Sequence, residues 1–120
     1  MDAISNRIIG CALTVANTLG GGFLEKVYEN ALAFELRTAG LAVEQQRGMT
    51  VSYKGIAIGE YFSDLLVEGV VLVELKTVQA LNRAHRAQCV NYLRATGLHL
   101  CLLINSGAPR LEVRRVVQDL

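Results

Sequence analysis

The chain has 120 residues, of which 52% are apolar and 19% are charged, so its composition is that of a globular domain and excludes a disordered segment. A net charge of +1 gives no overall attraction to a polyanion. The charge is uneven, however, because residues 77–120 hold six arginines and only two acidic residues. This segment fits either a phosphate backbone or an ordinary solvated surface, and composition favours the ordinary surface.

The three cysteines, Cys11, Cys89 and Cys101, are far apart in the sequence and form no C-x-x-C pair. Such a pattern indicates neither a disulfide framework nor a zinc site, so we expect reduced core residues, a single domain over residues 1–120 and a cytoplasmic location. The run "LHLCLLI" is far shorter than the about 20 apolar residues that cross a bilayer. No membrane role is therefore indicated.

Two helices are predicted first in chain order. Apolar residues recur every three or four positions over residues 3–19, and this pattern stops at Gly20-Gly21-Gly22. A second helix is predicted over residues 23–39, because Gly40 stands where a helix commonly ends in the left-handed conformation.

Strands dominate the remainder of the chain. The first is predicted to end at about Tyr53, before a turn at Lys54-Gly55, and the next two are "IAIGEYFSDLL" and "VVLVELK". A third helix is predicted from an Asn82 N-cap to Gly97, followed by the buried strand "LHLCLLIN" and the alternating edge strand "RLEVRRVV". The order α-α-β-β-β-α-β-β predicts an α/β (α+β) fold, in which a mixed β-sheet is flanked by helices and the third helix crosses over to a parallel strand.

Asp64, Glu74 and Lys76 interrupt the two most apolar strands, where an unpaired charge costs several kcal/mol. Glu74 and Lys76 are two residues apart on a strand and so share a face. A three-residue loop over residues 67–69 places Asp64 opposite Leu72 and diagonal to Glu74, whereas a two-residue turn places it on the other face. A glycine at position 69 favours the three-residue loop.

Two carboxylates that converge on one point need a cation between them, and such oxygen ligands suit Mg²⁺ or Mn²⁺. A neighbouring lysine can then orient a bound water or stabilise charge on a phosphate. The alternative is a buried ion pair between Lys76 and either Asp64 or Glu74. These three residues alone favour neither interpretation.

Two helices offer further candidates. Glu25 lies in the first turn of the second helix, where it either leans over the metal site or compensates the helix dipole. Gln88 and Tyr92 are one turn apart on the third helix, where they either bind the lysine or a phosphate or border solvent. A single histidine, His85, is interpreted as a packing or capping residue.

Read in order, the chain carries Gly22-x-x-Glu25-x-x-Tyr28, Asp64, Glu74-x-Lys76 and Gln88-x-x-x-Tyr92. With "YENALAFEL", "DLLVEG" and "QCVNYL", it resembles the GxxExxY protein family of the PD-(D/E)xK nuclease superfamily, from about residue 4 to residue 117. Ser63 stands where the superfamily name has proline.

The resemblance implies a restriction-endonuclease-like core. It assigns Asp64 and Glu74 to the metal-binding acids, Lys76 to the lysine of E-x-K, and Glu25 to the helical acid of the first motif. Gln88 and Tyr92 match the Q-x-x-x-Y of RecB-like branches. The implied activity is hydrolysis of a nucleic-acid phosphodiester by water, with Mg²⁺ (or Mn²⁺) as the cofactor.

Two functions follow from this sequence. The first is a Mg²⁺-dependent nuclease that acts on nucleic acid, with DNA as the expected partner over RNA. The alternative is a non-catalytic nucleic-acid- or protein-binding module on the same fold, acting within a repair or defence complex. The exposed final strand leaves open a homodimer or a protein partner.

Overall fold

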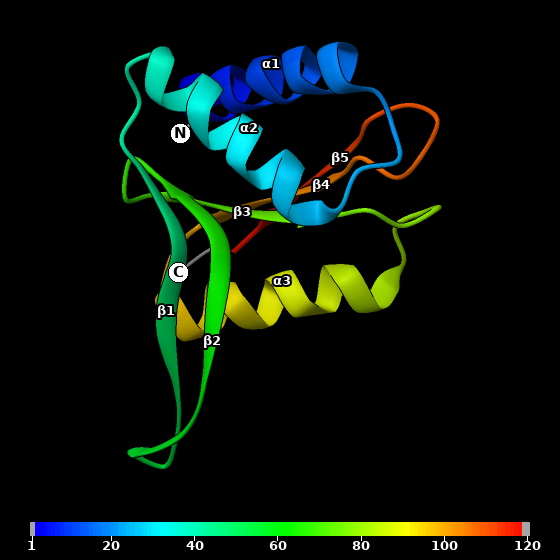
Figure 1. Ribbon diagram of the computed structural model, residues 1–120. Coiled ribbons are helices and arrows are strands. Elements are labelled where there is room, and N and C mark those ends of the chain that lie inside the picture. Colours follow the sequence, from blue (N-terminus) through cyan, green and yellow to red (C-terminus); the bar gives the residue numbers. More distant parts are fainter. Residues whose placement is uncertain (1, 119–120) are drawn as a thin grey trace.

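The computed structural model describes residues 2–118, in which one five-stranded mixed sheet carries helices on both faces (Figure 1). Its elements follow the predicted order: α1 (Asp2–Leu19), α2 (Glu25–Thr38), β1 (Val43–Tyr53), β2 (Ile56–Val67), β3 (Val71–Lys76), α3 (Arg83–Thr96), β4 (Leu100–Asn105) and β5 (Glu112–Val117). Helices α1 and α2 cover one face, and α3 covers the other (Figure 1). The predicted order and fold class are confirmed.

The strands lie in sequence order, β1-β2-β3-β4-β5. All neighbouring pairs are antiparallel except β3 and β4, which are parallel and joined by α3. The predicted crossover is confirmed, and it follows from chain length, because only a long connection can return a chain to the start of a parallel strand. Strands β3 and β4 are buried on both faces, as their continuous apolar sequences predict.

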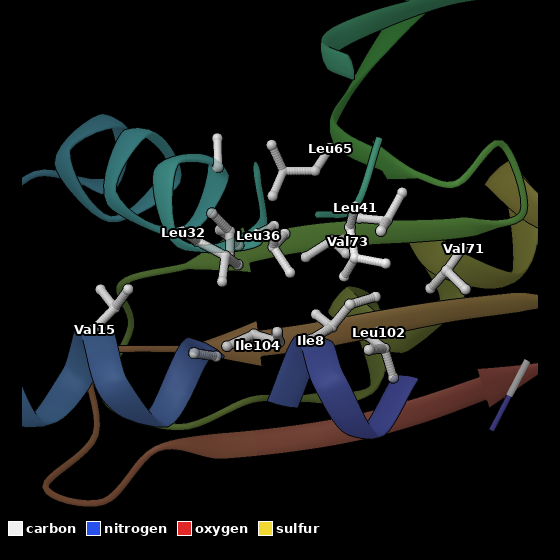
Figure 2. Close-up of a cluster of buried hydrophobic side chains, with 14 of the residues drawn as sticks. Ile8, Val15, Leu32, Leu36, Leu41, Leu65, Val71, Val73, Leu102 and Ile104 are labelled. Carbon is white, nitrogen blue, oxygen red and sulfur yellow. The ribbon is translucent and has the colours of Figure 1, made fainter. Parts of the chain in front are cut away.

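The larger core lies between α1, α2 and the sheet. Figure 2 shows Ile8 and Val15 of α1 and Leu32 and Leu36 of α2 converging on side chains of the sheet: Leu65, Val71, Val73, Leu102 and Ile104. The first two helices are therefore held by apolar stripes, as their periodicity predicts. Within residues 2–118, no helix is long and apolar enough to cross a membrane.

A second core lies beneath α3, where Cys89 and Leu93 pack on Leu66, Leu72, Cys101 and Leu103. Cys11, Cys89 and Cys101 are free thiols; Cys89 and Cys101 are fully buried core residues, as expected, whereas Cys11 is only half-buried. Asn82 caps α3 by accepting a hydrogen bond from the His85 backbone N–H (3.0 Å), and the His85 ring accepts one from the Asn82 backbone N–H (3.2 Å). Of the two roles expected for His85, packing or capping, the structure shows capping.

The loop between β2 and β3 differs in detail from the prediction. Leu66 pairs with Leu72, and not with Val70, so the loop comprises residues 68–70 instead of 67–69. Two successive residues, Glu68 and Gly69, have positive φ angles of 53° and 67°. The loop still has three residues, which keeps the parity of the strands, and the two-residue turn is excluded. The predicted position of Asp64 opposite Leu72 is wrong, because the shift by one residue brings it level with Glu74.

Strands β1 and β2 continue well beyond the rest of the sheet as a projecting hairpin that passes alongside α3 (Figure 1). The hairpin end, residues 50–60, is exposed throughout. Its apolar side chains include Tyr53, Ile56 and Ile58, each about 60% exposed or more. This part of the hairpin is held by cross-strand pairing and not by a core.

Candidate active site

Asp64 lies where β2 and β3 separate. Regular pairing of these strands ends at Leu65 and Val73, and the next residues on the two strands are Asp64 and Glu74. Beyond that point, the Asp64 carboxylate accepts a hydrogen bond from the Leu75 backbone N–H (Oδ2 to N, 2.7 Å). A side-chain oxygen therefore receives a β3 backbone N–H beyond the last regular pair, which fixes the carboxylate between the strands.

Glu74 is a carboxylate without adequate solvation. Glu74 is only 6% exposed, and its Oε1 atom has no hydrogen-bond partner among residues 2–118. Burial, followed by the nearby charge of Asp64, raises the pKa of Glu74 to about 8. An ionised Glu74 at this position calls for a cation, since desolvation and a neighbouring like charge both disfavour the anion.

Lys76 and Gln88 stand beside the two acids. Lys76 is half-buried at the end of β3, and its Nζ atom lies 3.4 Å from Gln88 Oε1 on α3. Burial raises the pKa of Asp64, and the ammonium of Lys76 partly opposes that increase. The predicted E-x-K pair thus shares one neighbourhood with Asp64 and with the predicted glutamine.

Glu25 reaches the same neighbourhood from the other face of the sheet. It is the first residue of α2, and burial, followed by the charge of Asp64, raises its pKa. The loop before it is held by Tyr28, whose hydroxyl donates to the Gly20 carbonyl (2.7 Å) and accepts from the Phe23 backbone N–H (3.3 Å). Gly22 supplies a φ of 97° in this loop. The spacing G-x-x-E-x-x-Y therefore has a structural explanation: Gly22 allows the turn, Glu25 supplies the acid, and Tyr28 holds the loop by hydrogen bonds.

Tyr92 lies on the α3 side of the site. Its ring stacks on that of Tyr61, with centroids 3.7 Å apart and an interplanar angle of 11°. Burial, followed by the charge of Glu74, raises the pKa of Tyr92 to about 12 and raises that of Tyr61 as well. Both phenols thus keep their protons near Glu74, where they can donate hydrogen bonds.

A hydrogen-bonded network behind Asp64 could not be recognised from the sequence. Glu29 is 3% exposed, and its carboxylate accepts from Lys26 (2.8 Å), Gln45 (2.8 Å) and Gln46 (2.7 Å). The Gln46 amide also lies 3.3 Å from Asp64 Oδ1, so one NH₂ group bridges the two carboxylates. Gln46 has a φ of 52°, an uncommon conformation that no local motif announces.

These residues fit a divalent cation. Among residues 2–118, no group of three or more His, Cys, Asp or Glu side chains has the arrangement of a metal cage. Asp64 and Glu74 instead offer two carboxylates, and one buried oxygen of Glu74 has no hydrogen-bond partner within this range. This donor set suits Mg²⁺, which is usually bound by one or two carboxylates and keeps several waters.

The sequence also matches a known family of proteins. The family model of the PD-(D/E)XK nuclease superfamily matches residues 2–116, and the chain belongs to that superfamily. The crystal structure of SSO0001 is similar with a TM-score of 0.59 and 15% identity over 79% of this chain. This chain corresponds to 50% of that protein's length.

An alkaline exonuclease from Laribacter hongkongensis (LHK-Exo) is similar at a TM-score of 0.41 and 14% identity, over 90% of this chain and 76% of the exonuclease chain. No curated protein matches the sequence.

Proposed function

We propose that this protein is a Mg²⁺-dependent nuclease that hydrolyses phosphodiester bonds of nucleic acid, with DNA as the expected substrate. The observation that supports the proposal most strongly is the buried Glu74 oxygen, which lies beside Asp64 and Lys76 and has no hydrogen-bond partner in the described part of the chain. A structural ion pair would leave no acceptor unsatisfied at this depth, because an unpaired buried polar atom costs about 1–3 kcal/mol. The motif Gly22-x-x-Glu25-x-x-Tyr28 further supports placement in the GxxExxY family.

Each residue has a defined part in this proposal. Asp64 and Glu74 would hold the divalent cation, which when bound would supply positive charge to polarise the scissile phosphate and to activate water. Lys76 places an ammonium where negative charge develops on the phosphate, and Gln88 orients that ammonium through its Oε1 atom. Glu25 orients water from the first turn of α2, and the Tyr92 hydroxyl donates to the substrate phosphate.

The proposal is tested with labelled single-stranded and double-stranded DNA and RNA, incubated with Mg²⁺, Mn²⁺ or EDTA. We expect cleavage with either metal and none with EDTA. Asp64→Asn, Glu74→Gln and Lys76→Ala are each expected to lower the rate by at least about 100-fold, since removal of one group that stabilises transition-state charge typically costs 10²–10³.

Arg37→Ala is a matched control for the Lys76 variant. It removes one positive charge from a side chain that binds Gln45 and the Val43 carbonyl. Cleavage that persists in folded Lys76→Ala protein would refute the assignment. Salt-dependent binding without cleavage on any substrate would instead identify the chain as a binding module.

A further inference from the structure

Three of the six arginines in the C-terminal third surround one hollow on the surface. The hollow has a volume of about 300 Å³ and is lined by Leu81, Asn82, Arg83, Arg86, Leu103 and Arg114. It lies between the start of α3 and the edge strand β5, where Leu103 of β4 pairs with Arg114. The folded chain thus gathers arginines that are up to 31 positions apart in the sequence.

The arginines differ in how they are held. Arg83 and Arg86 are exposed and lie one turn apart on α3, and neither forms an ion pair with any acid in residues 2–118. Arg114 lies 3.6 Å from Glu112, whose other oxygen accepts from Asn105 (2.8 Å) and from the Leu81 backbone N–H (3.3 Å). Glu112 is therefore fixed at the rim of the hollow, where it positions Arg114. The three arginines and Glu112 together carry a charge of +2.

Guanidinium groups around an apolar floor suit a phosphate ester. Arginine presents planar N–H donors that bind phosphate oxygens in pairs, and it is less strongly hydrated than lysine. The amino end of α3 at Asn82 adds a partial positive charge on the same side. A single inorganic anion would use the charge alone, whereas a nucleic-acid strand also places its sugars against the half-buried Leu81.

We propose that Arg83, Arg86 and Arg114 bind the phosphate backbone of nucleic acid outside the scissile position. This proposal rests on the proposed function in taking nucleic acid as the ligand. Gln88 and Tyr92 lie on the opposite side of α3 from Arg83 and Arg86, as the 100° step between helical residues requires. A strand that contacts both sites must pass around a helix about 10 Å wide, so the arginine site binds a flank several nucleotides from the cleaved bond.

Two adjacent residues provide a matched test. Arg114 faces the hollow, whereas Arg115 points to the other face of the sheet and bonds to Asn6 (2.8 Å) and Asp2 (3.4 Å). Arg114→Ala and Arg115→Ala remove the same charge from neighbouring positions on β5. The affinity of each full-length variant for a fluorescein-labelled 20-base-pair DNA is measured by anisotropy in EDTA, from 50 to 200 mM salt.

We expect Arg114→Ala to flatten the slope of log K against log salt by about 0.9, which corresponds to one lost phosphate contact. Arg83→Ala/Arg86→Ala should flatten it by about twice that amount, and Arg115→Ala should match the wild type. Melting temperatures near that of the wild type show that the variants are folded.

Equal slopes for Arg114→Ala and Arg115→Ala, or no DNA affinity in the wild type, would overturn the arginine site. DNA binding with the predicted slopes in a protein that never cleaves would support the site and refute the nuclease. The two proposals can therefore fail separately.

Discussion

At the scale of single residues, the candidate site holds two largely buried carboxylates that differ in their hydrogen bonds. Asp64 accepts one backbone N–H and lies near one amide N–H, from Leu75 and Gln46, whereas Glu74 has an oxygen with no partner in residues 2–118. The two acids are therefore unequal, with Asp64 already oriented and Glu74 available for a ligand. Gln46 orients Asp64 through the same amide group that binds Glu29.

Replacing Gln46 with glycine tests the role of its amide beside Asp64. Glycine adopts the φ of 52° without strain, but it removes the hydrogen bond to the buried Glu29 carboxylate, so the free energy of unfolding should fall by about 1–3 kcal/mol. Loss of the amide removes a donor to Asp64, so Mn²⁺ affinity measured by calorimetry should fall roughly 10-fold. Gln45→Gly is the control, because Gln45 binds Glu29 and Asn30 but not Asp64. Equal Mn²⁺ affinity in both variants would remove the role assigned to Gln46.

Glu74 should make the metal-free protein less stable in alkaline solution. Its pKa is raised from 4.5 to about 8 in the folded state, so the folded protein retains a proton that the unfolded chain releases. The stabilising contribution is complete below about pH 4.5 and is lost as pH rises through about 8. Urea unfolding in EDTA should show this decline between pH 5 and pH 8.5, and Glu74→Gln should reduce its slope. An identical slope in the variant would contradict the raised pKa.

At the scale of elements, the end of β3 is positioned by the segment after β4. The buried Asn105 side chain binds both backbone groups of Val78 and the N–H of Gly107, at 2.9–3.0 Å. The Ser106 backbone N–H donates to the Lys76 carbonyl (2.9 Å). Lys76 is thus held by its own strand and by the end of β4. The backbone of Gly107 lies so close to that of residues 77 and 78 that no side chain fits at position 107.

Gly107→Ala tests that close approach. A Cβ atom at Gly107 would overlap the backbone of Thr77 and Val78, so one segment must move. We expect a loss of about 1–3 kcal/mol in the free energy of unfolding, typical of overpacking. Gly59→Ala is the control, because a Cβ atom there meets nothing within 4 Å. Chemical denaturation that gives the same loss for both variants would show that packing at Gly107 is not the cause.

Elements were predictable here where one pattern decides the structure. Periodicity and glycine stops defined α1 and α2, and the Asn82 cap defined α3. The β2–β3 loop was misplaced by one residue because Glu68, and not only Gly69, adopts a positive φ.

The Glu29–Gln46 network and the packing at Gly107 depend on contacts between distant segments. No local pattern carries that information. The six residues predicted for the site, in contrast, could be proposed from the sequence alone because their types and spacing form a recognisable series.

At the scale of the whole molecule, stability is unevenly distributed. Strands β3 and β4 are buried between two helical layers, whereas residues 50–60 of the β1–β2 hairpin are exposed on both faces. Amide hydrogens in residues 50–60 should therefore exchange at least about 100-fold faster than those in β3 and β4, as followed by mass spectrometry. The distribution would be contradicted if residues 50–60 were protected as strongly as β3 and β4 at both low and high protein concentration. Protection that appears only at high concentration would identify the hairpin as a contact between copies.

The central claim is that Asp64 and Glu74 together hold a divalent cation. The most direct measurement is anomalous diffraction from crystals soaked in Mn²⁺ at pH 8, where Glu74 is substantially ionised. We predict a peak within ligand distance of both carboxylates, about 2.0–2.2 Å from an oxygen of each, and its disappearance in Glu74→Gln. A peak elsewhere, or none at this position while the side chains of Asp64 and Glu74 keep their places, would contradict it.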